Sequence, residues 1–185
     1  MTNEILERYA RTAEGRVIID ITADKVEYLF NDFDRHAPYM RKELDQDLVD
    51  YLVDSMREIG DEEVQMQFGF AEPIGDKQRE RVRTSIHNYF IYLKGLEVLE
   101  LKKLIRRFMI FLLIGFSIMA VSVWVNDNIN HASAISRVFA EGLTVAAWVS
   151  LWEACSTLLI NWTPHRRQIK WCEKLASAPV TFSRV

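Results

Sequence analysis

This chain of 185 residues has little of the material from which disulfide frameworks and nucleotide sites are built. It contains only Cys155 and Cys172, and the first lies in an apolar stretch, so free thiols are predicted. Its seven glycines are scattered and form no phosphate loop or dinucleotide fingerprint. Recognisable pairs of nucleophile and base and clusters of metal-binding residues are missing as motifs. We therefore expect no catalytic activity, no cofactor and no metal.

Charge is nearly absent from two long stretches of the chain. Residues 108–125 (FMIFLLIGFSIMAVSVWV) contain no charged side chain, and a second apolar stretch runs from Gly142 to Trp162. As helices, the two stretches would be roughly 27 Å and 31 Å long, close to the thickness of bilayer hydrocarbon. We expect a transmembrane helical hairpin over residues 101–163, with spans at about 107–126 and 138–162.

The charges that are present are sorted along the chain. Residues 1–76 contain 8 Lys and Arg against 19 Asp and Glu, a net charge of −11, whereas residues 77–107 contain 9 against 3. A mainly acidic exposed region would repel a phosphate backbone, which argues against nucleic acid as a partner. The basic excess lies next to the first apolar stretch, which suggests that it contacts the lipid surface.

Basic residues flank the outer ends of both stretches, whereas the connection over residues 126–136 has no Lys or Arg. Positively charged flanks stay in the cytoplasm, so both termini are predicted to be cytoplasmic and the connection external. Residues 164–185 are then expected to form a cytoplasmic basic tail. We refer to the flanking residues at the membrane surface as the basic collar: Lys102, Lys103, Arg106, Arg107, Arg166, Arg167 and Lys170.

Residues 1–100 predict a small α+β head of the order β-α-β-α. Short strands are predicted over Arg16–Thr22 and Glu63–Ala71, with a helix over Asp45–Ile59 between them. A long helix is predicted to begin at Asp76 and to enter the first span, either unbroken or with a bend at Gly95. Two strands make a poor sheet alone, so we expect another chain to supply a strand or helix.

Glu153 lies near the middle of the second apolar stretch, where an ionised carboxylate facing lipid costs at least about 2.5 kcal/mol. We expect it to lie in a packed polar seam, where it is either protonated or hydrogen-bonded to a side chain such as Ser117 or Ser122 of the first span. The alternatives are proton or cation handling, or contact with a separate membrane protein. The expected packing ridge has small residues every four positions, and a polar row lies beside it. The ridge is Gly142, Ala146, Ser150 and Ala154, and the row is Glu153, Thr157 and Asn161.

The segments TVAAWVSLWEACSTLLINWTPHRRQIKWCEKLASAPVTF, LFNDFDRHAPYMRKELDQDLVDYLVDSMREIG and VQMQFGF resemble a group of small uncharacterised bacterial two-span membrane proteins with a cytoplasmic α+β head. The matching positions are Trp148, Val149, Leu151, Trp152, Pro164, Arg166 and Arg167. The resemblance implies a bacterial inner-membrane location and assigns no activity. Similar chains often have a basic residue and a proline where this one has Glu153 and Ala154, which argues against a general catalytic role for Glu153.

These observations favour a homo-oligomeric scaffold, assembly or regulatory component of the bacterial inner membrane, without catalytic activity. Its expected partners are the lipid bilayer, further copies of itself and another membrane protein. One alternative is a small oligomeric ion or proton channel or transporter in which Glu153 lines the pathway. The other is an accessory subunit of a larger membrane complex.

Overall fold

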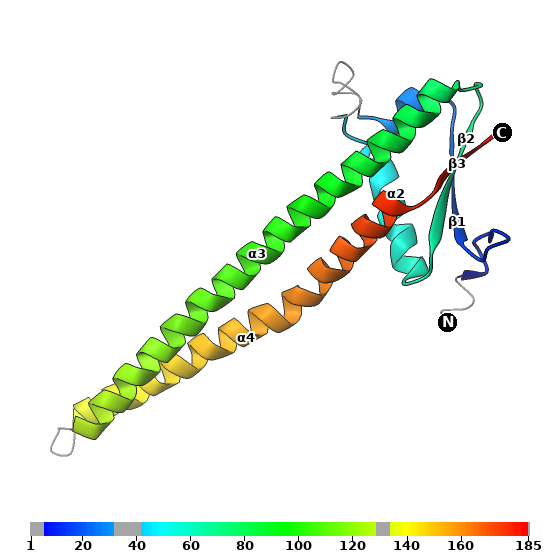
Figure 1. The fold of residues 1–185 in the computed structure, drawn as a ribbon. Coiled ribbons are helices and arrows are strands. Elements are labelled where there is room, and N and C mark those ends of the chain that lie inside the picture. Colours follow the sequence, from blue (N-terminus) through cyan, green and yellow to red (C-terminus); the bar gives the residue numbers. More distant parts are fainter. Residues whose placement is uncertain (1–5, 32–41, 129–133, 185) are drawn as a thin grey trace. The chain divides into compact units, whose positions relative to one another are not determined.

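The structure is a computed structural model that describes residues 6–31, 42–128 and 134–184 (Figure 1). The chain divides into two compact units, described separately below. The head unit comprises Met1–Leu96 and Gln168–Val185, and the hairpin unit comprises Glu97–Arg167. The elements are, in order, β1 (Val17–Ala23), a 3-10 turn η1 (Val26–Leu29), α2 (Gln46–Ile59), β2 (Val64–Phe70), α3 (Asp76–Asn128), α4 (Ala134–Ser177) and β3 (Val180–Arg184).

The head unit is built on a parallel sheet with the strand order β1-β2-β3. Val17 lies opposite Val64 in the first pair, and Phe68 lies opposite Phe182 in the second. Parallel neighbours need a crossover connection. α2 provides the crossover from β1 to β2, and α3 followed by α4 connects β2 to β3. The hairpin unit is therefore inserted into the second crossover of the head.

One face of the sheet is covered by α2 and by the head-unit parts of α3 and α4 (Figure 1). Alternate residues of β1 and β2 point into this core because side chains in a strand alternate between faces. The other face has a polar row in which Asp20, Gln67 and Thr181 are register partners. The core is formed mainly by Val17, Ile19, Val64, Met66, Phe68, Leu52, Met56, Val82, Ile86, Phe90, Cys172 and Leu175.

The sequence signals for α2 are confirmed at both ends of the helix. The Asp45 carboxylate accepts hydrogen bonds from the backbone N–H groups of Asp47 and Leu48, as an N-cap residue does. Gly60 ends the helix with φ of 74°, a conformation that glycine adopts without steric cost. The predicted order of strand, helix, strand and helix is found in the structure.

The third strand is a correction to the two-stranded head predicted from the sequence. Residues 164–185 were expected to form a separate basic tail, but β3 pairs with β2 and residues 168–185 belong to the head unit. The Gln65 side chain also donates to Thr181 Oγ1 at 3.2 Å. The edge of β2 that was expected to need another chain is therefore covered by this chain.

Both long helices are continuous, and for the first helix this confirms the unbroken alternative predicted from the sequence. α3 is one helix from Asp76 to Asn128 and passes through Gly95, while α4 passes through Pro164. A proline removes one helical N–H, and the remaining hydrogen bonds continue the helix on both sides. Within the head unit the two helices are linked by Lys94 and Glu173 at 3.0 Å and by His87 Nδ1 and the Ala176 carbonyl at 2.8 Å.

Candidate functional site

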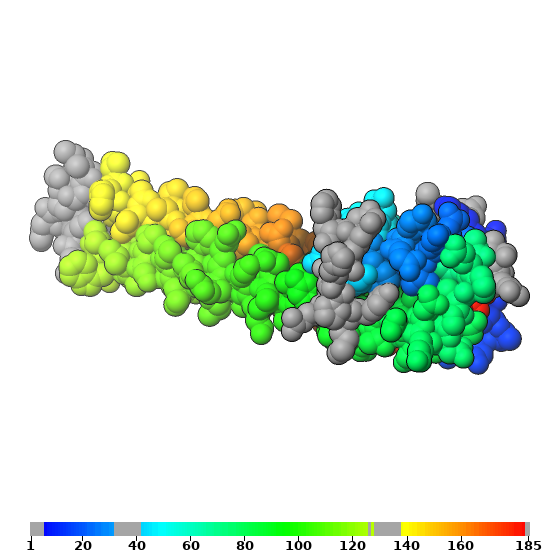
Figure 2. All heavy atoms as spheres, turned by 90° about the horizontal axis from the view of Figure 1, so that it is seen from above, coloured from blue at the N-terminus to red at the C-terminus, as the bar shows by residue number. Residues whose placement is uncertain are grey.

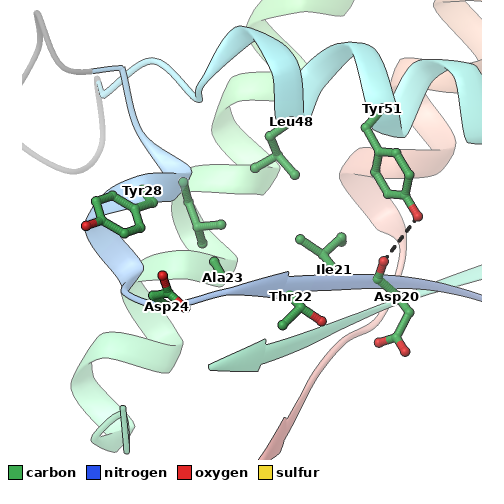
Figure 3. A pocket seen from close by; sticks show the side chains of 9 residues that line it. Asp20, Ile21, Thr22, Ala23, Asp24, Tyr28, Leu48 and Tyr51 are labelled. Atoms are coloured by element: carbon green, nitrogen blue, oxygen red, sulfur yellow. Dashed lines mark hydrogen bonds between the residues drawn. The ribbon is translucent and has the colours of Figure 1, made fainter. Parts of the chain in front are cut away.

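The head has a hollow of about 510 Å³ beside the carboxyl end of β1 (Figure 3). Tyr51 closes one end, where its hydroxyl donates to the Asp20 carbonyl at 3.2 Å. The Asp20 carboxylate and the Thr22 hydroxyl lie on the opposite side of β1 from α2, away from Leu48 (Figure 3). The Asp20 carboxylate and the Thr22 hydroxyl therefore do not point into the hollow toward Leu48.

The hairpin unit has a tightly packed contact between α3 and α4, which lie side by side (Figures 1 and 2). A Cβ atom added at Gly115 would lie 2.9 Å from Cγ of Leu151 and 3.4 Å from its backbone nitrogen. The contact is lined by small buried residues at intervals of seven, the period of knobs-into-holes packing. This hairpin seam comprises Gly115 and Ser122 of α3 and Ala140, Ala147 and Ala154 of α4.

Polar atoms at the hairpin seam have partners within it. Ser122 Oγ lies 2.6 Å from Thr144 Oγ1 and 3.4 Å from the Ala140 carbonyl oxygen. Thr144 also donates to that carbonyl at 3.1 Å. Hydroxyl groups that form such hydrogen bonds within or between helices do not need water as a partner. The described part of the seam contains no buried side-chain polar atom that lacks a partner.

The predicted packing ridge differs from the seam that the structure shows. Of its four members only Ala154 is buried, whereas Gly142 and Ala146 are exposed and Ser150 is half-buried. The Ser150 hydroxyl donates to the carbonyl of Ala146 in its own helix at 2.9 Å. The prediction followed intervals of four, but two helices in contact meet on a period near 3.5, so Ala147 takes the place assigned to Ala146.

Glu153 lies outside the hairpin seam and its side chain is exposed. The expected partners are engaged elsewhere, because Ser117 donates to the Leu113 carbonyl at 2.7 Å and Ser122 bonds to Thr144. In the polar row, Asn161 donates to the Thr157 carbonyl at 3.2 Å. Among the described residues, none forms a hydrogen bond or ion pair with the Glu153 carboxylate. The predicted polar seam around Glu153 is therefore not formed within one chain.

Large apolar side chains cover the outward surface of the hairpin unit. Each helix contains an 18-residue window that is long and apolar enough to cross a membrane, and only 11% of each window is buried. The core helix of a water-soluble domain would bury most of such a stretch. The most exposed residues are Leu113, Phe116, Val123, Trp124, Val138, Phe139, Val145, Trp148, Val149, Trp152, Leu159 and Ile160.

All seven residues of the basic collar are exposed, and two make contacts that hold their charges near the ends of the apolar stretches. The Arg166 guanidinium lies 5.8 Å from the ring centroid of Trp162, within cation–π range. Lys103 donates to Glu100 at 2.6 Å, and this hydrogen bond lowers the pKa of the Glu100 carboxyl below its usual value.

A hydrogen bond between the side chains of α3 and α4 was missed in the sequence reasoning. His165 Nδ1 lies 2.9 Å from Glu97 Oε2, and both side chains are partly buried. The sequence alone assigned no partner to His165 or Glu97. The two residues are 68 positions apart in the sequence. Their pairing depends on the register of the two helices, which the sequence does not show.

In comparisons with known proteins, no family model, curated protein or solved structure matches this chain.

Proposed function

We propose that this chain is a bacterial inner-membrane protein whose hairpin unit crosses the bilayer and holds the head unit at the cytoplasmic surface. The observation that supports the proposal is the outward apolar surface of both long helices. Water would be in contact with side chains such as Leu113 and Trp152, which are 63% and 75% exposed. Exposure of these apolar side chains to water costs free energy, and bilayer hydrocarbon removes that cost. The backbone hydrogen bonds are made within each helix, so the backbone needs none from lipid.

The orientation follows from the basic collar. Its exposed cations flank the open end of the hairpin unit, next to Trp162, and Trp124 lies near the other end. Lys and Arg stay on the cytoplasmic side, while tryptophans favour both lipid–water interfaces. The termini and the head unit would then be cytoplasmic.

The role that fits this arrangement best is that of a membrane scaffold, assembly or regulatory component without catalytic activity. The head supports this role because the polar row of its sheet offers a surface for contacts. A scaffold that binds other proteins needs a folded head that is held at the membrane surface. The proposed arrangement has both features.

Membrane insertion is tested by two matched substitutions. Leu113 in the hairpin and Tyr28 in the head are each 63% exposed. An arginine near the centre of a span costs roughly 2.5 to 3.5 kcal/mol on insertion scales, whereas an arginine on a water-facing surface costs little. Leu113→Arg should shift the full chain out of carbonate-washed bacterial membranes, and Tyr28→Arg should leave it there. Equal partitioning of both variants, or a parent chain recovered in the soluble fraction, would contradict the proposal.

A further inference from the structure

Glu153 is a site in the hairpin unit where an ionisable side chain has no partner among the described residues. It lies near the middle of the stretch from Gly142 to Trp162, so a bilayer would surround it with hydrocarbon. Its side chain is exposed, and no described residue forms a hydrogen bond or ion pair with its carboxylate. A carboxyl group at this depth needs a polar partner or a proton, and lipid chains offer neither.

The surroundings of Glu153 on α4 allow another helix to come close. Gly142, Ala146, Val149 and Glu153 are spaced by four, three and four residues, so they share one helix face. All four are exposed, and at 100° per residue this Glu153 face is roughly 130° away from the hairpin seam. A Cβ atom at Gly142 would meet nothing within 4 Å, in contrast to Gly115. The chain's own packing thus leaves the small residues of this face unused.

We propose that a second copy of this chain packs on the Glu153 face, so that the two Glu153 carboxyl groups meet and hydrogen-bond to each other. The inference rests on the proposed membrane location. Two copies inserted with the same orientation are related by a two-fold axis along the membrane normal, and such an axis places each residue opposite its counterpart at equal depth. Two protonated carboxyl groups can then donate to each other, which leaves no net charge in the hydrocarbon.

A second copy can supply a hydrogen-bond partner for Glu153, which lipid chains cannot, because its own Glu153 lies at the same depth in the bilayer. Gly142 and Ala146 would face their counterparts, where the lack of large side chains lets the backbones approach. The hairpin seam is already filled within each chain, so the two contacts use different sides of α4. The expected complex is a dimer built on α4.

Cysteine cross-linking tests the contact directly. In a background with Cys155→Ser and Cys172→Ala, Ala146→Cys is compared with Val145→Cys, which is one residue away in depth and faces a different direction. The full chain is reconstituted in phosphatidylcholine vesicles and oxidised with copper phenanthroline. Ala146→Cys should form covalent dimers several-fold faster than Val145→Cys. Equal rates at both positions, or no dimer at Ala146→Cys, would overturn the proposal.

The role of Glu153 is tested in the same Ala146→Cys background. Glu153→Gln retains groups that can hydrogen-bond across the interface and should retain most of the cross-linking. Glu153→Leu suits a lipid-facing helix and removes the hydrogen bond, so most of the cross-linking should be lost. Equal cross-linking in the Leu and Gln variants would overturn the carboxyl contact.

Carbonate extraction of the same samples separates the two proposals. A chain that remains in the vesicles but does not cross-link at position 146 contradicts only the dimer contact. A chain that is extracted by carbonate contradicts the membrane location. A stable complex with a different membrane protein and no dimer, detected by native mass spectrometry, would also overturn the second copy as the occupant of this face.

Discussion

At the scale of single residues, Gly115 determines how closely the two long helices approach each other. An alanine there would bring its methyl group to 2.8 Å from Cδ2 of Leu151, and the nearby backbone nitrogen limits how far the contact can relax. Overpacking of this kind costs roughly 1 to 3 kcal/mol. We predict that Gly115→Ala lowers the thermal stability of the hairpin in detergent, measured by circular dichroism.

Gly95 is the matched control for this substitution because it lies in the same helix. A Cβ atom at Gly95 would meet nothing within 4 Å, so Gly95→Ala should raise helix stability by about 1 kcal/mol through helix propensity. Opposite signs for the two variants would support the packing role of Gly115. Stabilisation by both would show that the contact with Leu151 relaxes at no cost.

A second residue-scale prediction concerns transport. If Glu153 is in contact with its counterpart in a dimer, the carboxyl groups are sealed from water, and vesicles containing the parent chain should have the proton leak of empty vesicles. A pH-sensitive dye inside the vesicles measures the leak. Proton flux in the parent that is lost in Glu153→Gln would instead support the alternative of a channel or transporter.

The residue scale also shows why the site was only partly predictable. The apolar stretches, Glu153 and Ala154 were identified from composition and position, but the partners of Ser117 and Ser122 were assigned incorrectly. A sequence shows which small residues lie on which face of a helix. It does not show which face meets the neighbouring helix, because that depends on the register and on contacts such as the one between Gly115 and Leu151.

At the scale of elements, β3 completes the head through Phe182. Its ring lies 6.3 Å from that of Phe68 and 6.4 Å from that of Phe70, and the Arg83 guanidinium lies 5.4 Å from its centroid. Because Phe182 is half-buried, we predict that Phe182→Ala destabilises the head by about 2 kcal/mol, less than a fully buried phenylalanine would.

Chemical denaturation of the full chain in detergent measures this loss. It is followed by the fluorescence of Trp171 in a background in which Trp124, Trp148, Trp152 and Trp162 are replaced by Phe. Ser183→Ala is the control because Ser183 is exposed and adjacent in the same strand. It should change the free energy of unfolding by less than about 0.5 kcal/mol. A similar loss in both variants would indicate that strand pairing itself, rather than the phenylalanine, was disturbed.

The elements were predicted unevenly for physical reasons. β1, α2 and β2 have strong local signals, such as the Asp45 cap and the alternation in β2. β3 is five residues long, and its partner β2 is more than a hundred residues earlier in the chain. The alternation of Val180 and Phe182 with Thr181 and Ser183, directly after Pro179, was the available signal, but the basic residues before it favoured a tail.

At the scale of the whole molecule, topology is the next property to measure. A reporter fused after Val185 should behave as cytoplasmic, and one inserted near Asn130, in the connection outside the described residues, should behave as external. The reason is the imbalance of Lys and Arg between the two ends of the hairpin. Replacing Lys102, Lys103, Arg106 and Arg107 with Gln should weaken the preference, and an external C-terminus in the parent would contradict it.

The insertion of the hairpin between β2 and β3 also imposes an order on biosynthesis. Both long helices leave the ribosome before β3 does, so the sheet of the head cannot be completed until the apolar stretches have been made. Until then β2 keeps an open edge, a state that invites pairing with other chains. Prompt insertion into the bilayer would shorten the time during which the edge of β2 is unpaired. Pairing of β3 with β2 would then occur only in molecules whose hairpin has been completed.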